Sequence, residues 1–382
     1  MKLRVVAIVF GVLLLYSGIS FYIGWNGWLF LSHLFHLENA TVYTIIASII
    51  AFSYIIGRLA YRAPFKPVAE VLKLIGSYWF AVLEYAVIIL PPANVVALIL
   101  KAAGAEKSIY IVGVGGLALL IMAVLLIRGS WNAWSPIVRT YHVQVPKPAG
   151  KLKKLRIAMA SDLHLGTIVG NRHLVRLVNK VKEIKPDLIL LPGDILDDDI
   201  EPFLRKNMST ELGKLKAPLG VYAVTGNHEY IGRKVPEFIA AMDAIGIRVL
   251  MDETALIADS FYVIGRKDKA AAGFSGKGRL PIQELVAPLD QSRPLIMLDH
   301  QPSDIASAAD NGIDISVSGH THRGQMMPNH LITRKLFELD WGYLKKGGLH
   351  AIVSSGFGTW GPPVRIGSRS EVIHIEVEFT TV

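Results

Sequence analysis

Long hydrophobic runs fill the first third of the chain, and short ones fill the rest. Four of the long runs can cross a hydrocarbon layer, which needs ~20 helical residues. They cover approximately residues 5–23, 41–60, 77–101 and 108–127. The third run contains Glu84 and the pair Pro91-Pro92, which predicts a kinked helix. Neighbouring helices can satisfy the carbonyl groups that proline leaves free. We therefore predict a membrane domain with four spans.

Beyond residue 139 the pattern changes to short strands and amphipathic helices. Strands are expected at 141–145, 155–160, 188–191, 221–224, 296–298 and 315–317, and helices at 171–185, 235–244 and 304–309. The alternation of strand and helix predicts a mostly parallel sheet covered on both faces, which is an α/β class. Two late segments, 351–354 and 372–379, alternate as antiparallel strands do and predict a second sheet.

These patterns divide the chain into two domains. We predict a transmembrane helical domain at residues 1–135 and a second, α/β domain at residues 136–382. The strands at 141–145 and 155–160 are expected to be joined by a turn region at 146–154, which contains two prolines and a glycine.

The positive charge of the chain lies mainly in the membrane half. Residues 1–150 contain eleven Lys and Arg, four Glu and no Asp, so they carry +7 of the net charge of +9. Basic residues collect on one side of the predicted spans: Lys2, Arg4, Arg58, Arg62, Lys66, Lys73, Arg128 and Arg139. Only Lys101 and Lys107 fall on the other side. The positive-inside rule then predicts a multi-pass inner-membrane protein with a cytoplasmic C-terminal domain. This nearly neutral domain lacks the charge of a nucleic-acid groove, so no nucleic acid is expected as a partner.

The chain has no cysteine. Disulfides, thiolate metal sites and cysteine nucleophiles are therefore excluded, and any metal must have nitrogen and oxygen ligands.

Five polar clusters come directly after predicted strands. They are Ser161-Asp162-Leu163-His164, Gly193-Asp194, Gly226-Asn227-His228-Glu229, Asp299-His300-Gln301-Pro302 and Gly319-His320-Thr321-His322. Ligands of open parallel sheets bind beyond the carboxyl ends of the strands, so the clusters can converge on one crevice. Each cluster alone is an ordinary turn sequence. The five together, in this order and spacing, indicate a functional site.

Seven side chains in these clusters are candidate metal ligands: Asp162, His164, Asp194, Asn227, His300, His320 and His322. Carboxylate, amide and imidazole ligands suit Mn, Fe or Zn. Seven ligands are too many for one tetrahedral ion, whereas two ions ~3.5–4 Å apart share them if a carboxylate bridges, and Asp194 is our candidate bridge. His228 is left over and is suited to donate a proton or hydrogen bond to the phosphate or leaving group.

Other polar residues lack this context. The histidines at 142, 173, 330 and 374 are interpreted as structural or surface residues, and Asp197-Asp198-Asp199 as a solvated loop, because consecutive carboxylates cannot all face one metal. The glycine cluster at 113–116 lies inside an apolar span and is interpreted as a helix-packing site.

The order Asp-x-His, Gly-Asp, Gly-Asn-His-Glu, His, Gly-His-x-His resembles that of the calcineurin-like metallophosphoesterases over approximately residues 155–378. The resemblance implies two β-sheets sandwiched between helices. It implies that Asp162, His164 and His322 hold one metal ion. It also implies that Asn227, His300 and His320 hold the other, with Asp194 as the bridge and His228 as the catalytic histidine.

Three further motifs resemble a bacterial membrane-associated branch of that family. They are Ser-Asp-Leu-His-Leu-Gly, His-Gln-Pro and the stretch from Ser354 to Arg365. Members of that branch are described as phosphodiesterases, and one type cleaves a nucleotide-lipid precursor. Where the branch tends to have glycine, this chain has Arg323, which either meets a second phosphate or only fills the loop. Trp360 either contacts a substrate base or acyl chain, or packs in the core.

The sequence therefore predicts two-metal hydrolysis of a phosphoric ester, with a phosphodiester or pyrophosphate of a membrane lipid or nucleotide-lipid as the expected substrate. The alternative within enzymes is a membrane-anchored phosphatase acting on soluble nucleotides or phosphoproteins. A transporter or receptor with an inactive regulatory domain is a rival from another class, and the intact ligand set argues against it.

Overall fold

The computed structural model describes residues 2–61, 66–275 and 278–380 of the chain. Arg62, used above for the orientation of the spans, lies outside these residues. Contacts between residues divide the chain into two compact units, with the main boundary between Ser130 and Trp131.

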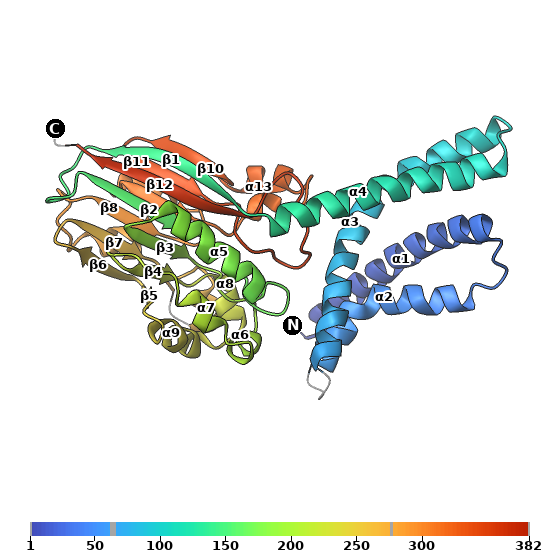
Figure 1. Cartoon of the computed structure of the whole chain (residues 1–382), viewed down its shortest axis with the longest axis horizontal. Coiled ribbons are helices and arrows are strands. Elements are labelled where there is room, and N and C mark those ends of the chain that lie inside the picture. The colour runs from blue at the N-terminus through green and yellow to red at the C-terminus, as the bar shows by residue number, and fades with distance from the viewer. Residues whose placement is uncertain (1, 62–65, 276–277, 381–382) are drawn as a thin grey trace. The chain divides into compact units, whose positions relative to one another are not determined.

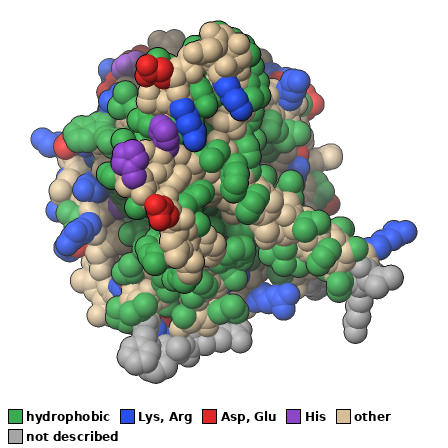
Figure 2. Space-filling view, turned by 90° about the vertical axis from the view of Figure 1, so that its right-hand side faces the viewer, with side chains coloured by type: hydrophobic (Ala, Val, Ile, Leu, Met, Phe, Trp, Pro, Cys, Tyr) green, Lys and Arg blue, Asp and Glu red, His purple; other side chains and the backbone are tan. Residues whose placement is uncertain are grey.

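The first unit contains four helices that are long and apolar enough to cross a membrane. They are α1 (Lys2–Phe35), α2 (Thr41–Ala60), α3 (Lys66–Ala102) and α4 (Val114–Trp134), the last preceded by a π-helical turn, η1 (Ile109–Gly113) (Figure 1). Many of their Leu, Ile and Val side chains are exposed, as a lipid environment requires. Figure 2 shows broad hydrophobic areas on one face of the molecule.

The helices differ from the predicted spans mainly in length. α1 continues past residue 23 to Phe35, and within this extension the side chain of Asn26 donates a hydrogen bond to the Tyr22 carbonyl one turn earlier. α3 runs through Pro91 and Pro92. At Gly115 a Cβ atom would lie 2.7 Å from the Phe30 ring, so this glycine permits close packing of α4 against α1, in agreement with the predicted packing role of its cluster.

The second unit is built on two six-stranded sheets. The first has the strand order β1 (Ile137–Val145), β12 (Glu371–Phe379), β2 (Lys154–Met159), β3 (Leu188–Pro192), β4 (Val221–Val224), β5 (Arg248–Val249). The second has the order β10 (Gly342–Lys346), β11 (Leu349–Val353), β9 (Ile315–Ser318), β8 (Leu295–Leu298), β7 (Phe261–Gly265), β6 (Glu253–Ile257). Most neighbouring strands are parallel, as the sequence predicted.

Helices cover the outer faces of both sheets. The helices and helical turns of this unit are α5 (Asn171–Ile184), α6 (Glu201–Arg205), α7 (Met208–Leu212), α8 (Asn227–Ile231), α9 (Val235–Asp243), α10 (Ala271–Ser275), α11 (Ile282–Val286), α12 (Ile305–Asp310), η2 (His322–Gly324) and α13 (His330–Leu336). One apolar core lies between the first sheet and helices such as α5 and α9. A second fills the space between the sheets, and a third joins the second sheet to α11 and α12. The predicted α/β class with two sheets between helices is confirmed.

β1 and β2, on either side of the 146–154 turn region, are not neighbours in the sheet, because β12 lies between them, parallel to β1 and antiparallel to β2. The prediction about the two late strands needs correction. The late strands β11 and β12 are not purely antiparallel, since each has one parallel and one antiparallel neighbour. β12 is buried along most of its length, which fits a strand in the sheet interior.

Candidate metal centre

All five polar clusters lie directly beyond strand ends. The first follows β2, the second β3 and the third β4, all in the first sheet, whereas the other two follow β8 and β9 in the second sheet. β2, β3 and β4 are parallel neighbours, as are β8 and β9. Their carboxyl ends therefore share an edge in each sheet, and the structure brings the seven predicted ligands together there.

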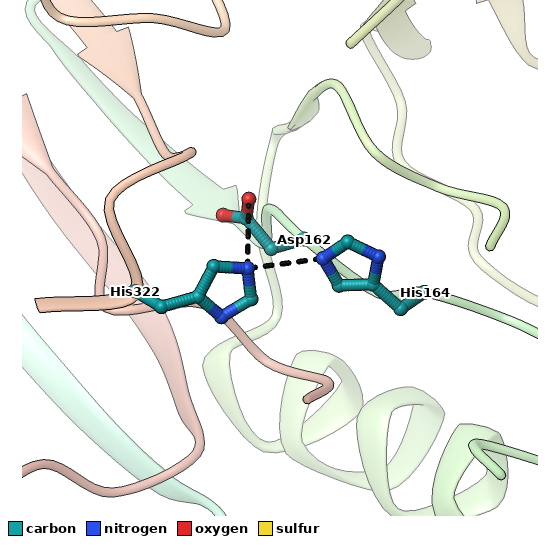
Figure 3. Close-up of side chains that lie close together, drawn as sticks. All are labelled: Asp162, His164 and His322. Carbon is teal, nitrogen blue, oxygen red and sulfur yellow. Dashed lines mark hydrogen bonds and ion pairs between the residues drawn. The ribbon is translucent and has the colours of Figure 1, made fainter. Parts of the chain in front are cut away.

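Three of the ligands form a first group. His164 and His322 have their Nε2 atoms 3.0 Å apart, and His322 Nε2 lies 3.5 Å from Asp162 Oδ1 (Figure 3). Ligand atoms around one tetrahedral ion lie about 3.3 Å apart when the metal bonds are about 2 Å long. The three side chains are buried and present their donor atoms at the spacing that one ion requires.

Three other ligands form a second group. Asn227 Oδ1 lies 2.9 Å from His320 Nδ1 and 3.2 Å from His300 Nε2, and the two imidazole nitrogens are 3.3 Å apart. The other ring nitrogen of His300, Nδ1, lies 2.9 Å from the Pro192 carbonyl at the end of β3. That hydrogen bond fixes the ring and leaves Nε2 for a metal, as is usual for metal-binding histidines.

Asp194 stands between the groups. Its Oδ2 atom lies 3.1 Å from His300 Nε2 in the second group and 3.9 Å from His164 Nε2 in the first. Its other oxygen accepts a hydrogen bond of 3.0 Å from the backbone N–H of His228. The residues present therefore fit two divalent ions bridged by one carboxylate.

Two ligand histidines and the bridging carboxylate have protonation states that suit metal binding. Burial lowers the pKa of His164 to about 3, and burial together with the nearby His300 lowers the pKa of His320 to about 4, so both imidazoles are neutral with free lone pairs. Burial alone would raise the pKa of Asp194, but the charge of His300 holds it well below its usual range. Asp194 is thus an anion at neutral pH. Burial lowers the pKa of a third ligand histidine, His300, but the charge of Asp194 outweighs burial and raises that pKa.

Several ligands have left-handed backbones. The φ angles are positive at Asp162, His164, Asp194, His320 and His322, where they lie between 46° and 70°. Such conformations cost about 1–3 kcal/mol each for non-glycine residues and concentrate at functional sites. Two glycines permit the close approach of neighbouring loops, because a Cβ at Gly226 would overlap the Asp194 carboxylate and one at Gly319 would overlap that of Asp162.

His228 lies beside both groups. Its ring is edge-on to that of His164 with centroids 4.6 Å apart, and its Nε2 lies 4.0 Å from Asp194 Oδ2. Its Nδ1 lies 2.8 Å from Asp198 Oδ1. Burial lowers the pKa of His228, but the bond to Asp198 and the neighbouring carboxylates outweigh it and raise the pKa to about 9. The interpretation of Asp197-Asp198-Asp199 as only a solvated loop is therefore wrong for Asp198.

The two residues predicted to contact substrate have different surroundings. Trp360 is 61% exposed, and its ring centroid lies 6.4 Å from that of His228. Gln325 fixes its position by accepting a hydrogen bond from its N–H and donating one to its carbonyl. Arg323 instead places its guanidinium 3.9 Å from the ring centroid of Trp341 and donates a hydrogen bond to the Gly367 carbonyl.

Two buried charged residues that support the ligands were missed by the sequence analysis. Glu229 accepts hydrogen bonds from the backbone N–H groups of Asp194, Leu196 and Gly226, and so ties two ligand loops together. Its place at the end of Gly-Asn-His-Glu was the available signal. Arg365 is fully buried, donates to the Gly358 carbonyl and lies 3.3 Å from His322 Nδ1. It is the last residue of the motif from Ser354 to Arg365, which was the available signal.

Fold and site together define an α/β protein with a candidate two-metal centre, and comparison with known proteins places the chain in a family. The family model of the calcineurin-like phosphoesterases matches residues 155–324. An uncharacterized metallophosphoesterase of Aquifex aeolicus is 31% identical over 68% of this chain and 98% of its own length. The uncharacterized metallophosphoesterase YkoQ of Bacillus subtilis is also 31% identical, over 67% of this chain and 96% of its own length.

This chain belongs to the calcineurin-like metallophosphoesterases. A zebrafish (Danio rerio) relative described as a transmembrane protein with metallophosphoesterase domain is 32% identical over 68% of this chain. The match with that relative and with its bovine counterpart spans 61% of their length.

Proposed function

We propose that this protein hydrolyses a phosphodiester or pyrophosphate bond of a membrane lipid or nucleotide-lipid. The observation that carries the proposal is the pair of ligand groups sharing Asp194, in a chain that also has four helices suited to a membrane. We further propose Mn, Fe or Zn as the metals, because the donors are imidazole, carboxylate and amide. The proposed location is the inner membrane, with the catalytic unit in the cytoplasm.

Each side chain has a distinct role in this proposal. When bound, two divalent ions supply Lewis-acid activation of water and stabilise negative charge on the phosphoryl group. Asp162, His164 and His322 hold one position, and Asn227, His300 and His320 hold the other. Asp194 fixes the separation of the two positions.

His228 is proposed to donate a proton or a hydrogen bond to the leaving oxygen. The contact of its Nδ1 with Asp198 orients the ring and leaves Nε2 directed towards the space between the ligand groups. This arrangement requires no coordination by His228, because the seven other side chains account for both positions.

Trp360 is proposed to contact the organic part of the substrate. Its exposed ring beside His228 can stack on a base or lie against acyl chains. Arg323 was predicted either to meet a second phosphate or only to fill the loop. Its guanidinium contacts Trp341 and the Gly367 carbonyl, so Trp360 is the better supported substrate contact of the two.

Hydrolysis of lipid phosphodiesters in mixed micelles, with added manganese, tests this function. We expect turnover of at least one lipid-linked substrate by the wild-type protein and none by the Asp194→Asn variant. Turnover of soluble nucleotides or phosphoproteins with none of the lipid substrates would favour the anchored phosphatase instead. Equal turnover by wild type and variant would contradict a role for the centre.

A further inference from the structure

Two segments next to the metal centre carry exposed apolar side chains. We call these five side chains the apolar rim: Met327 (48% exposed), Leu331 (54%), Ile332 (59%), Leu336 (71%) and Trp360 (61%). The two segments that carry them are joined, because Gln325 pairs with the backbone of Trp360 and the Met327 N–H donates to the Ile366 carbonyl. Soluble proteins rarely leave large apolar side chains exposed in one place, and such a patch marks an interaction surface.

In α13 the polar and apolar faces are exchanged relative to those of an ordinary surface helix. Its half-buried residue Thr333 donates a hydrogen bond of 2.7 Å to the Asp340 carboxylate, so a polar side chain occupies the inner face. Leu331, Ile332 and Leu336 point to the outside, where a surface helix normally presents polar residues. Packing within the catalytic unit therefore does not explain these side chains.

The same helix carries positive charge. Arg334 and Lys335 are exposed between the leucine and isoleucine side chains. Apolar side chains flanked by basic residues, together with an exposed tryptophan, are typical of segments that lie in the interface of a bilayer containing anionic lipids.

The hydrogen bonds of the catalytic unit also include the last turn of α4. Asn132, in the last turn of α4, donates to the Arg365 carbonyl and accepts from the Ser370 N–H. Arg369 donates to both oxygens of Ser135. Residues 131–135 belong to the catalytic unit and directly follow the apolar part of α4, so residues 365–370 are tied to the chain segment at the end of that helix.

We propose that the apolar rim is a membrane-contact surface that inserts Ile332, Leu336 and their neighbours into the interface of the bilayer holding the protein. The occupant is the lipid surface, with Arg334 and Lys335 meeting anionic headgroups. Residues 327–336 of the rim follow the ligands His320 and His322 in sequence, and Phe337, at the end of α13, lies with its ring 6.0 Å from that of His320. A phosphate ester at the lipid surface would thus meet the centre without leaving the membrane, a consequence that rests on the proposed function.

The absence of native cysteine makes a direct test possible in the full-length protein. Ile332→Cys and Leu336→Cys are labelled with an environment-sensitive fluorophore and reconstituted singly in nanodiscs. The matched control is Leu256→Cys, an exposed leucine on β6 (43% exposed). We expect shifted emission at 332 and 336 and at least two-fold quenching by lipids that carry a shallow nitroxide, with little quenching at 256.

The outcomes are distinct, and none requires enzymatic activity. Quenching at 332 and 336 by aqueous iodide as strong as at 256, with no quenching by nitroxide lipids, would overturn the proposal. If the labels at 332 and 336 were shielded from iodide only when a disc holds two copies of the chain, the second copy would be the occupant. That result would also overturn the proposal. The combined Arg334→Gln and Lys335→Gln variant should lose part of the lipid quenching in anionic discs. Unchanged quenching would overturn the proposed role of these two charges.

Discussion

The two ligand groups of the metal centre have different surroundings. Asp162, His164 and His322 are buried, and the guanidinium of Arg365 lies behind His322. In the second group Asn227 and His320 are only half-buried, and the fixed member is His300, which contacts the Pro192 carbonyl. The metal position of the first group is thus enclosed next to the Arg365 cation, whereas the position of the second group is more accessible. We therefore expect a chelator to remove the ion of the second group first.

The largest effect is expected at the residue that both groups share. Asp194→Asn should abolish hydrolysis and lower the metal content at both positions, because its Oδ2 approaches ligands of each group. Asp187→Asn is a matched control, since Asp187 directly precedes the same strand at its opposite end and pairs with exposed Arg156. Metal analysis and turnover of both variants check this. Retained metal and turnover in Asp194→Asn would refute the bridge.

Variants within one ligand group test whether each group binds its own metal ion. His322→Ala should lower the metal content from about two ions to about one, and His320→Ala should do the same for the other position, because each side chain belongs to one group. Both variants should lose most of their activity. Elemental analysis of the purified variants tests this, and complete loss of metal in either one would show that the groups do not bind independently.

A smaller effect is expected at His228. His228→Ala should keep its metal and reduce kcat by a factor of ~10²–10⁴, the usual contribution of a positioned proton donor. The loss should be smaller for a nitrophenyl ester, whose leaving group needs little protonation, than for an alkyl ester. Steady-state kinetics of His228→Ala on the nitrophenyl and alkyl esters test whether His228 acts as a proton donor. Loss of metal would make His228 a ligand or support, and an equal loss on both substrates would point to charge stabilisation.

The smallest effect is expected at Asp198. Asp198→Asn should reduce kcat by about 10-fold, because an orienting partner contributes less than the donor that it orients. Metal content should be unchanged, since Asp198 Oδ1 contacts His228 Nδ1 and not a ligand. Steady-state kinetics measure the effect. If the double variant with His228→Ala were slower than His228→Ala alone, Asp198 would act by another route.

The sequence predicted the parts of the fold and site that local patterns encode. The helix that begins at Asn171 and the strand at 221–224 follow from hydrophobic periodicity and turn residues. The clustering of the ligands follows from polar residues at parallel strand ends. Both need only neighbours in sequence and a general rule about sheets.

Other features depend on contacts between distant residues. The position of β12 between β1 and β2 joins segments more than 200 residues apart, and β5 is only two residues long. The contact of Asp198 with His228 was not predicted, because three adjacent carboxylates are typical of a solvated loop. The burial of Arg365 and the outward apolar face of α13 oppose the usual rules for charged and apolar residues, so no pattern predicted them.

The number of metal ions in the active wild-type protein tests the central claim most directly. Titration of the metal-free, full-length protein, with bound metal and phosphoester hydrolysis measured on the same samples, gives that number. We predict that binding saturates at about two ions per chain and that full activity appears only as the second position fills. Full activity with one ion bound per chain would contradict a centre in which Asp194 joins two metal positions.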